Sequence, residues 1–483
     1  MRIYNTLTHR KQLFKTIVES KVCMYTCGPT VYNFAHIGNL RAYAVADLLK
    51  RVLIHDGYAV KHIMNITDVG HLVSDANLGE DKIRLTAQHE HKSVHDVAAF
   101  YTMEFMKDIK RLNLMVPDAM PKATENVKEM LEIIRVLNKK GYIYKIATGM
   151  YFDTSKFKNY GQLMNLNFDA LNNYLIAGAR VERAAGIKNT TDFAVWRFAT
   201  GNEKEMVWDA EYGRGFPGWH IECSAMSMKY LGEHFDIHTG GIDHLPIHHT
   251  NEIAQSEAAT RKKFVNYWVH NEFLLVDGKK MSKSLGNVYT LQSLIDKGHS
   301  ITAFKYLILS AHYRSQLNFT FEALENAENT IKGIYAFMKR LSDLEYSNKD
   351  KKINKAFIAR VARIRKAFLK QINDDLNTPL ALSELHSLIN ETNRLKGRRM
   401  SKDDANLVLE TLLDFDRILG LELEHHAKPK GTPKEVKELI AKRESLRKEK
   451  RFADADKIRE RLKREYGIEV EDSDHGPLWH AAN

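Results

Sequence analysis

The chain has 483 residues, which is too long for one ordinary hydrophobic core, so we expect two to four domains. Hydrophobic residues make up 44% and charged residues 28%, as in globular proteins in water, and no apolar run approaches the roughly 20 residues that cross a bilayer. Three cysteines and an N-terminus without a secretory signal exclude a disulfide framework and predict a reducing, cytoplasmic setting, while the net charge of +11 favours an anionic partner such as a nucleic acid.

The first 70 residues predict a strand–helix–strand unit. The β-prone run KVCMYTC, residues 21–27, is followed by a helical pattern with Leu40, Ala44 and Val52 on one face and Gly57 as a stop. The run YAVKHIMNITD, residues 58–68, then has the pattern of the next strand. This spacing predicts a parallel sheet with a right-handed crossover.

The remaining segments predict an insertion and at least one helical domain. Residues 80 to about 140 have helical spacing and residues 141–155 alternate like a hairpin, which is typical of an insertion between two halves of a sheet. The α/β pattern resumes near residue 218, and from about Thr320 to Leu421 the apolar residues recur as in a helix bundle. Residues 434–464 then hold thirteen Lys and Arg against seven Asp and Glu.

Four possible metal ligands come from distant parts of the chain. Cys27 follows the first strand, Cys223 lies in GWHIECSAM, and His248 and Glu252 are four residues apart on an expected helix, so both project from one face. Two thiolates, an imidazole and a carboxylate are a suitable set for tetrahedral Zn²⁺. The residues alone leave the alternative open, which is core thiols and surface imidazoles without a metal.

Two further segments are suited to bind phosphate. His36 and Gly38 lie where the first helix opens, and free backbone N–H groups at a helix N-terminus attract phosphate. In GKKMSKSLGN, residues 278–287, Lys280 and Lys283 flank Met-Ser in a glycine-bounded loop. Flexible ammonium groups there can follow the charge that develops on a triphosphate. Taken singly, the alternatives are a chance His-x-Gly and a solvated basic loop.

Together these segments resemble the class I aminoacyl-tRNA synthetases, through the His-Ile-Gly element after the first strand and Lys-Met-Ser-Lys-Ser after a later one. The stretches CGPTVY, RGFPGWHIECSAM, FDIH, HHTNEIAQSEA and LSAHYRSQLNF are similar to cysteinyl-tRNA synthetases in particular. DDLNTPLAL, residues 374–382, resembles the start of that family's helical anticodon-side domain, and the basic tail is similar to its C-terminal end.

The resemblance implies an α/β fold with a Rossmann-type parallel-sheet catalytic domain over residues 1–300 and a connective insertion at about 75–190. It also implies a stem-contact and helical anticodon-side bundle over 301–425 and a small basic tRNA-binding segment over 426–483. The implied activity is that of a cysteine–tRNA ligase, which activates L-cysteine with Mg²⁺ and ATP and transfers it to tRNA(Cys). We expect a cytoplasmic monomer that does not engage a membrane.

The resemblance further implies a role for each of the conspicuous residues. Zinc would select the substrate thiol, which as a thiolate is a soft ligand, over the hydroxyl of serine, and no editing domain is expected. The implied zinc ligands are Cys27, Cys223, His248 and Glu252; the implied catalytic and ATP-binding residues are His36, Gly38, Asn39, Lys280 and Lys283; and the implied amino-acid pocket includes Thr67, Trp219 and His238.

Three departures from the family pattern stand out. Asn39 replaces the last histidine of His-Ile-Gly-His, Thr250 replaces an acid, and an insertion follows Asp68. Two alternative functions stay open: a cysteine ligase that loads a small amine, and a non-catalytic, zinc-containing RNA-binding relative. Roughly 160 residues follow the helices after the Lys-Met-Ser-Lys-Ser motif, which favours tRNA over a small amine, and the intact lysines and zinc ligands favour catalysis.

Overall fold

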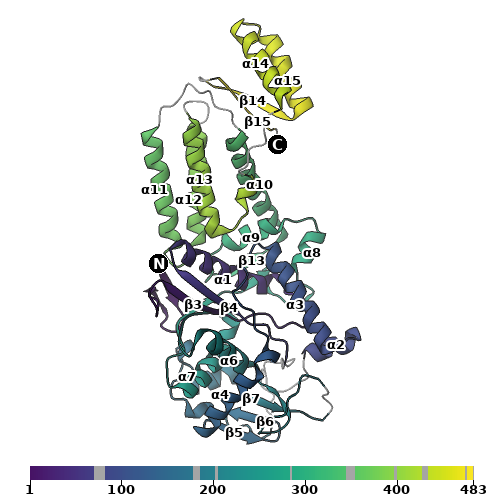
Figure 1. The fold of residues 1–483 in the computed structure, drawn as a ribbon, viewed down its shortest axis with the longest axis vertical. Helices are drawn as coiled ribbons and strands as arrows, with labels where there is room; N and C mark the ends of the chain where they lie inside the picture. The colour runs from purple at the N-terminus through teal and green to yellow at the C-terminus, as the bar shows by residue number, and fades with distance from the viewer. Residues whose placement is uncertain are drawn as a thin grey trace. The chain divides into compact units, whose positions relative to one another are not determined.

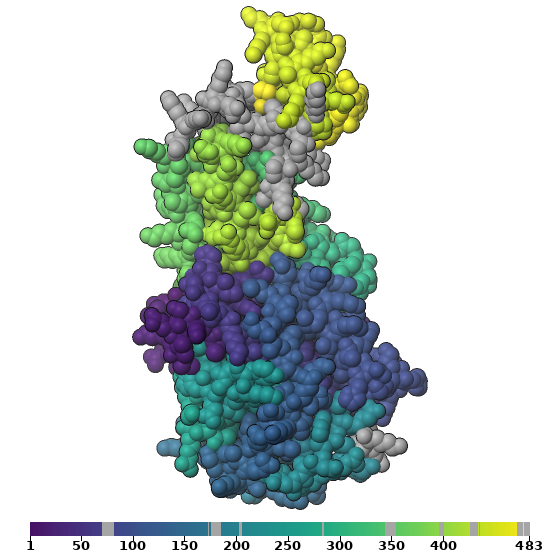
Figure 2. All heavy atoms as spheres, in the orientation of Figure 1, coloured from purple at the N-terminus to yellow at the C-terminus, as the bar shows by residue number. Residues whose placement is uncertain are grey.

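The computed structural model describes residues 1–69, 82–177, 185–201, 205–282, 285–343, 354–395, 400–426, 433–473 and 476–481. The chain divides into two compact units, of which the first contains Met1–Lys297 and Tyr313–Phe319 and the second contains Gly298–His312 and residues 320–483. Figures 1 and 2 follow the chain from purple at the N-terminus to yellow at the C-terminus. None of the described helices combines the length and apolar character needed to cross a membrane.

A parallel sheet in the order β10-β9-β3-β4 forms the centre of the first unit. Most residues of these strands are buried, as expected for strands that are covered on both faces. Helix α1 connects β3 to β4, so the predicted strand–helix–strand unit and the parallel α/β core are confirmed. The bounds are Lys21–Thr26 for β3, Ile37–His55 for α1, Ala59–Met64 for β4, Phe235–Gly241 for β9 and Val265–Asn271 for β10.

The strand register brings several strand ends to one edge of this sheet. Thr26 at the end of β3 is level with Met64 of β4 and Thr239 of β9, and Gly241 of β9 is level with Asn271 of β10. In open α/β sheets this carboxyl edge is where ligands bind. Cys27 directly follows Thr26, and therefore lies at this edge.

Helix α1 covers the sheet with the residues that the sequence pattern marked. Leu40, Ala44 and Val52 are buried, and the helix ends at His55, two residues before Gly57, whose φ of +91° favours glycine. Two more helices bring residues to the same edge: α6 spans Trp219–Leu231 before β9, and α7 spans Thr250–Thr260 between β9 and β10 (Figure 1). A π-helix, η5, spans Leu245–His249 and leads directly into α7.

The region between β4 and α6 forms the expected inserted structure. Its antiparallel sheet has the order β5-β6-β7-β8, and the hairpin predicted at residues 141–155 is β5 with β6. Strands β7 and β8 extend this sheet beyond residue 190, to Pro217. Residues 70–81, which hold most of the insertion after Asp68, lie outside the described residues. The elements are α2 (Lys82–Glu90), α3 (Val94–Arg111), η1 (Ala123–Asn126), α4 (Val127–Lys139), β5 (Ile143–Ile146), β6 (Gly149–Phe152), η2 (Thr154–Lys156), η3 (Gln162–Met164), α5 (Phe168–Ala177), β7 (Phe193–Phe198) and β8 (Gly215–Pro217).

Short elements complete the first unit. Strands β1 and β2 pair with each other, and β11 pairs with both β12 and β13. Strand β12 contains Lys280, so this small sheet supports the start of the lysine-rich loop. The bounds are Arg2–Asn5 (β1), Arg10–Leu13 (β2), Ile242–His244 (η4), Leu274–Val276 (β11), Lys279–Lys280 (β12), Leu291–Asp296 (α8) and Leu317–Phe319 (β13).

The second unit is helical, as the apolar spacing from Thr320 to Leu421 predicted. The rings of Phe368 and Phe415 stack in its core with centroids 3.8 Å apart. The basic segment forms two helices followed by a hairpin, on a core of Val436, Ile440, Leu462 and Val470. The elements are α9 (Ile301–Leu309), α10 (Phe321–Asp343), α11 (Lys355–Ile372), α12 (Thr378–Leu395), α13 (Lys402–Leu419), η7 (Leu423–His426), α14 (Lys434–Lys448), α15 (Phe452–Tyr466), β14 (Ile468–Ser473) and β15 (Gly476–Ala481).

Candidate active site and metal centre

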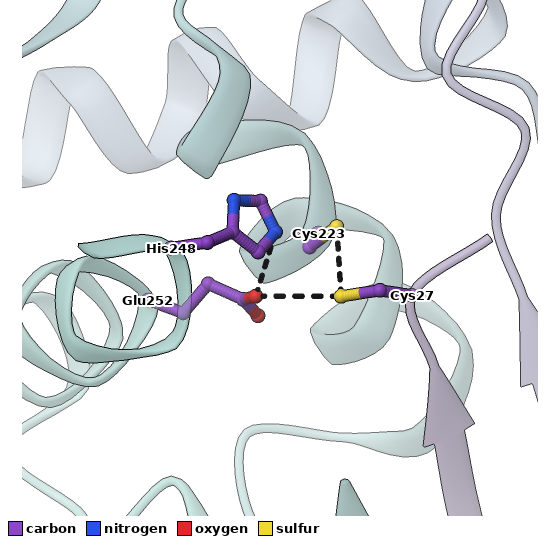
Figure 3. A group of neighbouring side chains, drawn as sticks. All are labelled: Cys27, Cys223, His248 and Glu252. Atoms are coloured by element: carbon purple, nitrogen blue, oxygen red, sulfur yellow. Dashed lines mark hydrogen bonds and ion pairs between the residues drawn. The ribbon is translucent and has the colours of Figure 1, made fainter. Parts of the chain in front are cut away.

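Four side chains from distant segments meet at the carboxyl edge of the parallel sheet. Cys27 follows β3, Cys223 lies in α6, His248 in η5 and Glu252 in α7, and Figure 3 shows their side chains turned toward one another. All four are buried, and the atoms that could bind a metal lie within 4.8 Å of each other. The fold thus brings together the four possible metal ligands that were predicted from the sequence.

The distances within this set fit a tetrahedral zinc ion. The two sulfur atoms of Cys27 and Cys223 are 3.8 Å apart, and Cys27 Sγ lies 3.7 Å from Glu252 Oε1. Two thiolates bound at about 2.3 Å in a tetrahedron are separated by about 3.8 Å, and a thiolate and a carboxylate oxygen by about 3.6 Å. His248 Nε2 lies 3.0 Å from Glu252 Oε1, so the imidazole also faces the common centre. Donor chemistry and spacing both fit Zn²⁺.

The π-helix η5 brings a second histidine to the same place. His249 Nε2 lies 3.3 Å from Cys27 Sγ and 3.9 Å from Glu252 Oε1, although His249 directly follows His248. A π-turn inserts one extra residue into a helix and is common at functional sites. The hydroxyl of Thr250 donates to the carbonyl of Leu245 at 2.7 Å, which closes this wide turn. His249 was not among the predicted ligands, and the His-His doublet at residues 248–249 is the signal in the sequence that points to it.

A second set of donors follows from this arrangement. Cys27, His238, His249 and Glu252 also place their possible ligand atoms within 4.8 Å of one another. The other ring nitrogen of His249, Nδ1, is hydrogen-bonded to Nε2 of His270 at 2.7 Å, which fixes the orientation of the ring. The set that includes Cys223 contains two thiols, and its donor types and spacing fit Zn²⁺ better.

Further side chains orient the possible ligands. His220 Nδ1 lies 2.9 Å from His248 Nδ1, which leaves the other ring nitrogen of His248 to face Glu252. His238 Nε2 lies 3.0 Å from Glu252 Oε2, so it holds the carboxylate oxygen that faces away from His248. Partners of this kind fix the orientation of metal ligands and affect metal affinity. His220 was not among the residues predicted from the sequence for this role.

Mutual charges set the protonation of the cluster. Burial, reinforced by Cys223, raises the pKa of the Cys27 thiol, whereas the hydrogen bond from Cys27 lowers the pKa of Cys223 to about 6. Burial opposes the charged forms of His248 and Glu252, but Cys223 and Glu252 raise the pKa of His248 to about 10, and His238 and His248 lower the pKa of Glu252 to about 2. Protons therefore occupy positions that a divalent cation would take over on binding.

His36 and Asn39 form a reciprocal cap at the start of α1. His36 Nδ1 accepts the backbone N–H of Asn39 at 3.1 Å, and Asn39 Oδ1 accepts the backbone N–H of His36 at 3.2 Å. Burial lowers the pKa of His36, so the ring is neutral near pH 7. Because Nδ1 is an acceptor, the proton of the neutral ring is on Nε2, which can donate to an anionic ligand. Asn39 keeps its Nδ2 group for the same purpose.

The lysine-rich loop approaches this helix end closely. A Cβ atom at Gly38 would lie only 2.4 Å from Met281 Cε, so the end of the methionine side chain packs directly on the helix start. Lys280 is exposed, and its ammonium lies 4.8 Å from the centre of the Phe273 ring. Lys283, predicted as catalytic and ATP-binding, lies outside the described residues.

One cavity of about 480 Å³ connects the two groups of residues. Its walls include residues predicted as metal ligands, as ATP-binding residues and as part of the amino-acid pocket. In that order they are Cys27, Cys223 and His248; His36, Gly38, Asn39 and Lys280; and Thr67 and Trp219. His238 is not among the described residues that line the cavity. It is fully buried, and its contact with the site is the hydrogen bond to Glu252. The ring of Trp219 packs on the ring of His248, with the two centroids 4.3 Å apart. The possible metal ligands and the N-terminal end of α1 therefore border one cavity.

Comparison with known proteins assigns the family. Residues 13–329 match the family of tRNA synthetases class I (C) catalytic domains, and residues 367–424 match the DALR domain. A cysteine–tRNA ligase of Treponema denticola is 44% identical, with 99% of each chain covered, and one of Brachyspira hyodysenteriae is 40% identical, with 99% of this chain and 98% of the relative covered.

The fold comparison agrees with this result. The structure of Mycobacterium tuberculosis methionyl-tRNA synthetase in complex with methionyl-adenylate is similar, with a TM-score of 0.59 and 14% identity over 85% of this chain and 92% of the other. At this identity the similarity concerns the fold alone, which is that of a class I synthetase. From the match of nearly the whole chain to cysteine–tRNA ligases, we conclude that the protein belongs to the cysteinyl-tRNA synthetase family.

Proposed function

We propose that the protein is a cysteine–tRNA ligase, which activates L-cysteine with ATP and attaches it to tRNA(Cys). The observation that carries the proposal is the single cavity that joins Cys27, Cys223 and His248 to His36, Asn39 and Lys280. Side chains suited to hold a thiol-binding metal and side chains suited to bind a triphosphate thus border the same cavity, which could take cysteine and ATP together. Identity of 44% with a cysteine–tRNA ligase over 99% of the chain supports the same activity.

Zinc would be held by Cys27, Cys223, His248 and Glu252, and would supply a soft Lewis acid that binds the substrate thiolate in preference to a hydroxyl. The protein's contribution to selectivity is the fixed geometry of these four side chains. His220 and His238 hold His248 and Glu252 in place, at 2.9 Å and 3.0 Å. A site built around one strong specific contact rejects an analogue that lacks it by roughly 10⁴–10⁵-fold, which is sufficient without editing.

In the first step, the carboxylate of cysteine attacks the α-phosphorus of Mg²⁺-bound ATP. A bond forms between a carboxylate oxygen and phosphorus, and the bond to the β-phosphate oxygen breaks, so that cysteinyl-adenylate and pyrophosphate result. Positioning and charge stabilisation dominate such reactions. His36 donates from Nε2 to the phosphates, with Asn39 beside it, and Lys280 and Lys283 neutralise the departing pyrophosphate.

In the second step, a terminal ribose hydroxyl of the tRNA attacks the carbonyl carbon of cysteinyl-adenylate, AMP leaves with the bonding electrons, and the hydroxyl proton passes to the departing AMP phosphate or to water. Thr67 and Trp219 line the cavity and would hold the amino acid during this transfer. The basic helices α14 and α15 would contact the phosphate backbone of the tRNA, with binding that weakens as the salt concentration rises.

The decisive experiment is the attachment of cysteine to tRNA(Cys), run in parallel with serine, together with cysteine-dependent exchange between ATP and pyrophosphate. We expect exchange and charging with cysteine and neither with serine. Exchange without charging of tRNA would instead indicate a ligase that loads a small amine. A purified, folded protein with no exchange would indicate the non-catalytic RNA-binding alternative.

A further inference from the structure

Arg41 on helix α1 is completely buried and binds three backbone carbonyl groups. Its Nη1 donates to the carbonyls of Glu272 and Phe273, both at 2.7 Å, and its Nη2 donates to the carbonyl of Ser315 at 2.6 Å. A buried guanidinium is costly unless its N–H groups find partners, and its planar fork can serve several acceptors at once. Arg41 therefore ties α1 to the segment that leads from β10 to β11.

The segment bound by Arg41 also supports Lys280. Phe273 presents its ring to the ammonium of Lys280 at 4.8 Å, and Lys280 is level with Leu275 in the pairing of β11 with β12. We call residues 277–282 the lysine segment. Phe273, whose carbonyl Arg41 binds, is two residues before Leu275, the residue that pairs with Lys280 of this segment.

The same helix binds the chain again after the lysine-rich loop. The backbone N–H of Ile37, the first residue of α1, donates to the carbonyl of Tyr289 at 2.8 Å, and His36 forms a β-bridge with Thr290. Between these ties, the end of the Met281 side chain packs directly against Gly38. Helix α1 consequently contacts the chain before the lysine segment, within it and after the loop.

We propose that Arg41 is a positioning residue for the activation step. By fixing the backbone of Glu272 and Phe273 to α1, it holds Lys280 in register with His36 and Asn39, so that both groups can meet the phosphates of one nucleotide. The proposal rests on the proposed function only in the identity of that nucleotide. A displacement of about 1 Å between such groups can lower a rate by about 10²-fold.

The test compares Arg41→Lys with a matched control, Arg51→Lys. Arg51 lies on the same helix and binds Asp47 and the carbonyl of Asn113, both at 2.7 Å, away from the lysine segment. A lysine at position 41 keeps the charge but cannot span three carbonyls. In ATP–pyrophosphate exchange we expect kcat to fall by about 10²-fold for Arg41→Lys with the KM for cysteine within twofold of wild type, and we expect less than threefold for Arg51→Lys.

A double-variant cycle with Lys280→Met separates positioning from general destabilisation. If Arg41 acts through Lys280, adding Arg41→Lys to Lys280→Met lowers kcat by less than about threefold further. Equal losses with and without Lys280, or a kcat of Arg41→Lys within threefold of wild type, would overturn the proposal. Should Arg41→Lys not fold, Phe273→Leu keeps the carbonyl tie and removes only the ring, with an expected loss of about two- to fivefold that disappears in the Lys280→Met background.

Hydrogen exchange gives a readout that does not depend on activity. We expect faster amide exchange in peptides that cover residues 272–282 for Arg41→Lys but not for Arg51→Lys, with other peptides of the parallel sheet unchanged. Unchanged exchange in residues 272–282 would overturn the positioning role even if the protein catalyses another reaction. Absence of ATP–pyrophosphate exchange by the wild type, with the expected hydrogen-exchange difference, would overturn the proposed function alone.

Discussion

The two ends of the cavity are built in different ways. The end with the possible metal ligands consists of completely or nearly completely buried side chains that hold one another through side-chain contacts, such as His220 with His248 and His238 with Glu252. The end proposed to bind phosphate, with His36, Asn39 and Lys280, is half-buried or exposed, and backbone groups hold it through the cap of α1 and the carbonyls at Arg41. Selection of a thiol needs a fixed geometry, whereas contacts to a triphosphate must follow charge as it moves.

The largest effect is expected at the buried end. Replacement of Cys27 by serine exchanges a soft donor for a hard one, so we expect zinc content to fall from one ion per chain and kcat/KM for cysteine activation to fall by about 10³–10⁵-fold. Zinc analysis of the purified variant and ATP–pyrophosphate exchange measure both. Cys23→Ser is the matched control, because Cys23 is only partly buried and belongs to neither donor set. A zinc-free Cys27→Ser protein with wild-type activity would contradict a role for the metal.

A smaller effect is expected at the exposed end. Lys280→Met removes one positive charge from solvent-accessible surroundings, and we expect kcat of the exchange reaction to fall by about 10²-fold while the KM for cysteine and the zinc content stay unchanged. Steady-state kinetics with varied cysteine and varied ATP check this division. Lys279→Met, the exposed neighbour, provides the control. Loss of zinc from Lys280→Met would mean that the two ends are not independent.

The supporting shell of the metal site is expected to matter less than its ligands. His238→Gln weakens the hold on Glu252, so we expect metal affinity to fall by about 10–100-fold while the ligands themselves remain. Competition with a chelator measures the affinity directly, and excess zinc should restore cysteine activation. A variant with unchanged affinity would place His238 in a purely structural role within the sheet.

The smallest effect concerns the protonation of His36. Burial lowers its pKa, so a folded protein keeps this ring neutral to a lower pH than an unfolded chain does. The resulting contribution to stability is present above pH 6.5 and is lost as pH falls from 6.5 through the lowered pKa of the folded state. A nuclear magnetic resonance titration of the His36 ring should give a midpoint below 6.5, and His36→Gln should remove this part of the pH dependence of unfolding. A midpoint at or above 6.5 would contradict the neutral, Nε2-protonated ring.

Short sequence motifs determined much of this picture. The spacing of apolar residues predicted β3, α1 and β4, because the helical and extended periods are written in neighbouring residues. Cys223, His248 and Glu252 lie in segments distinctive enough to point to a family, and the structure brings them to Cys27 as expected. Lys280 and Lys283 were likewise visible in their motif, and the roles of both lysines stay predictions.

Only the tertiary structure decided how these motifs are held. The tie from Arg41 to Glu272 joins residues 231 positions apart, and the contact of Cys27 with His249 joins residues 222 positions apart. A π-turn that presents both His248 and His249, and a hydrogen bond from Thr250 that closes it, leave no periodic trace in the sequence. Local patterns record the preferences of a residue and its neighbours, but contacts between distant residues depend on how strands and helices pack. The contacts of Arg41 with Glu272 and of Glu252 with His238 therefore follow only from the fold.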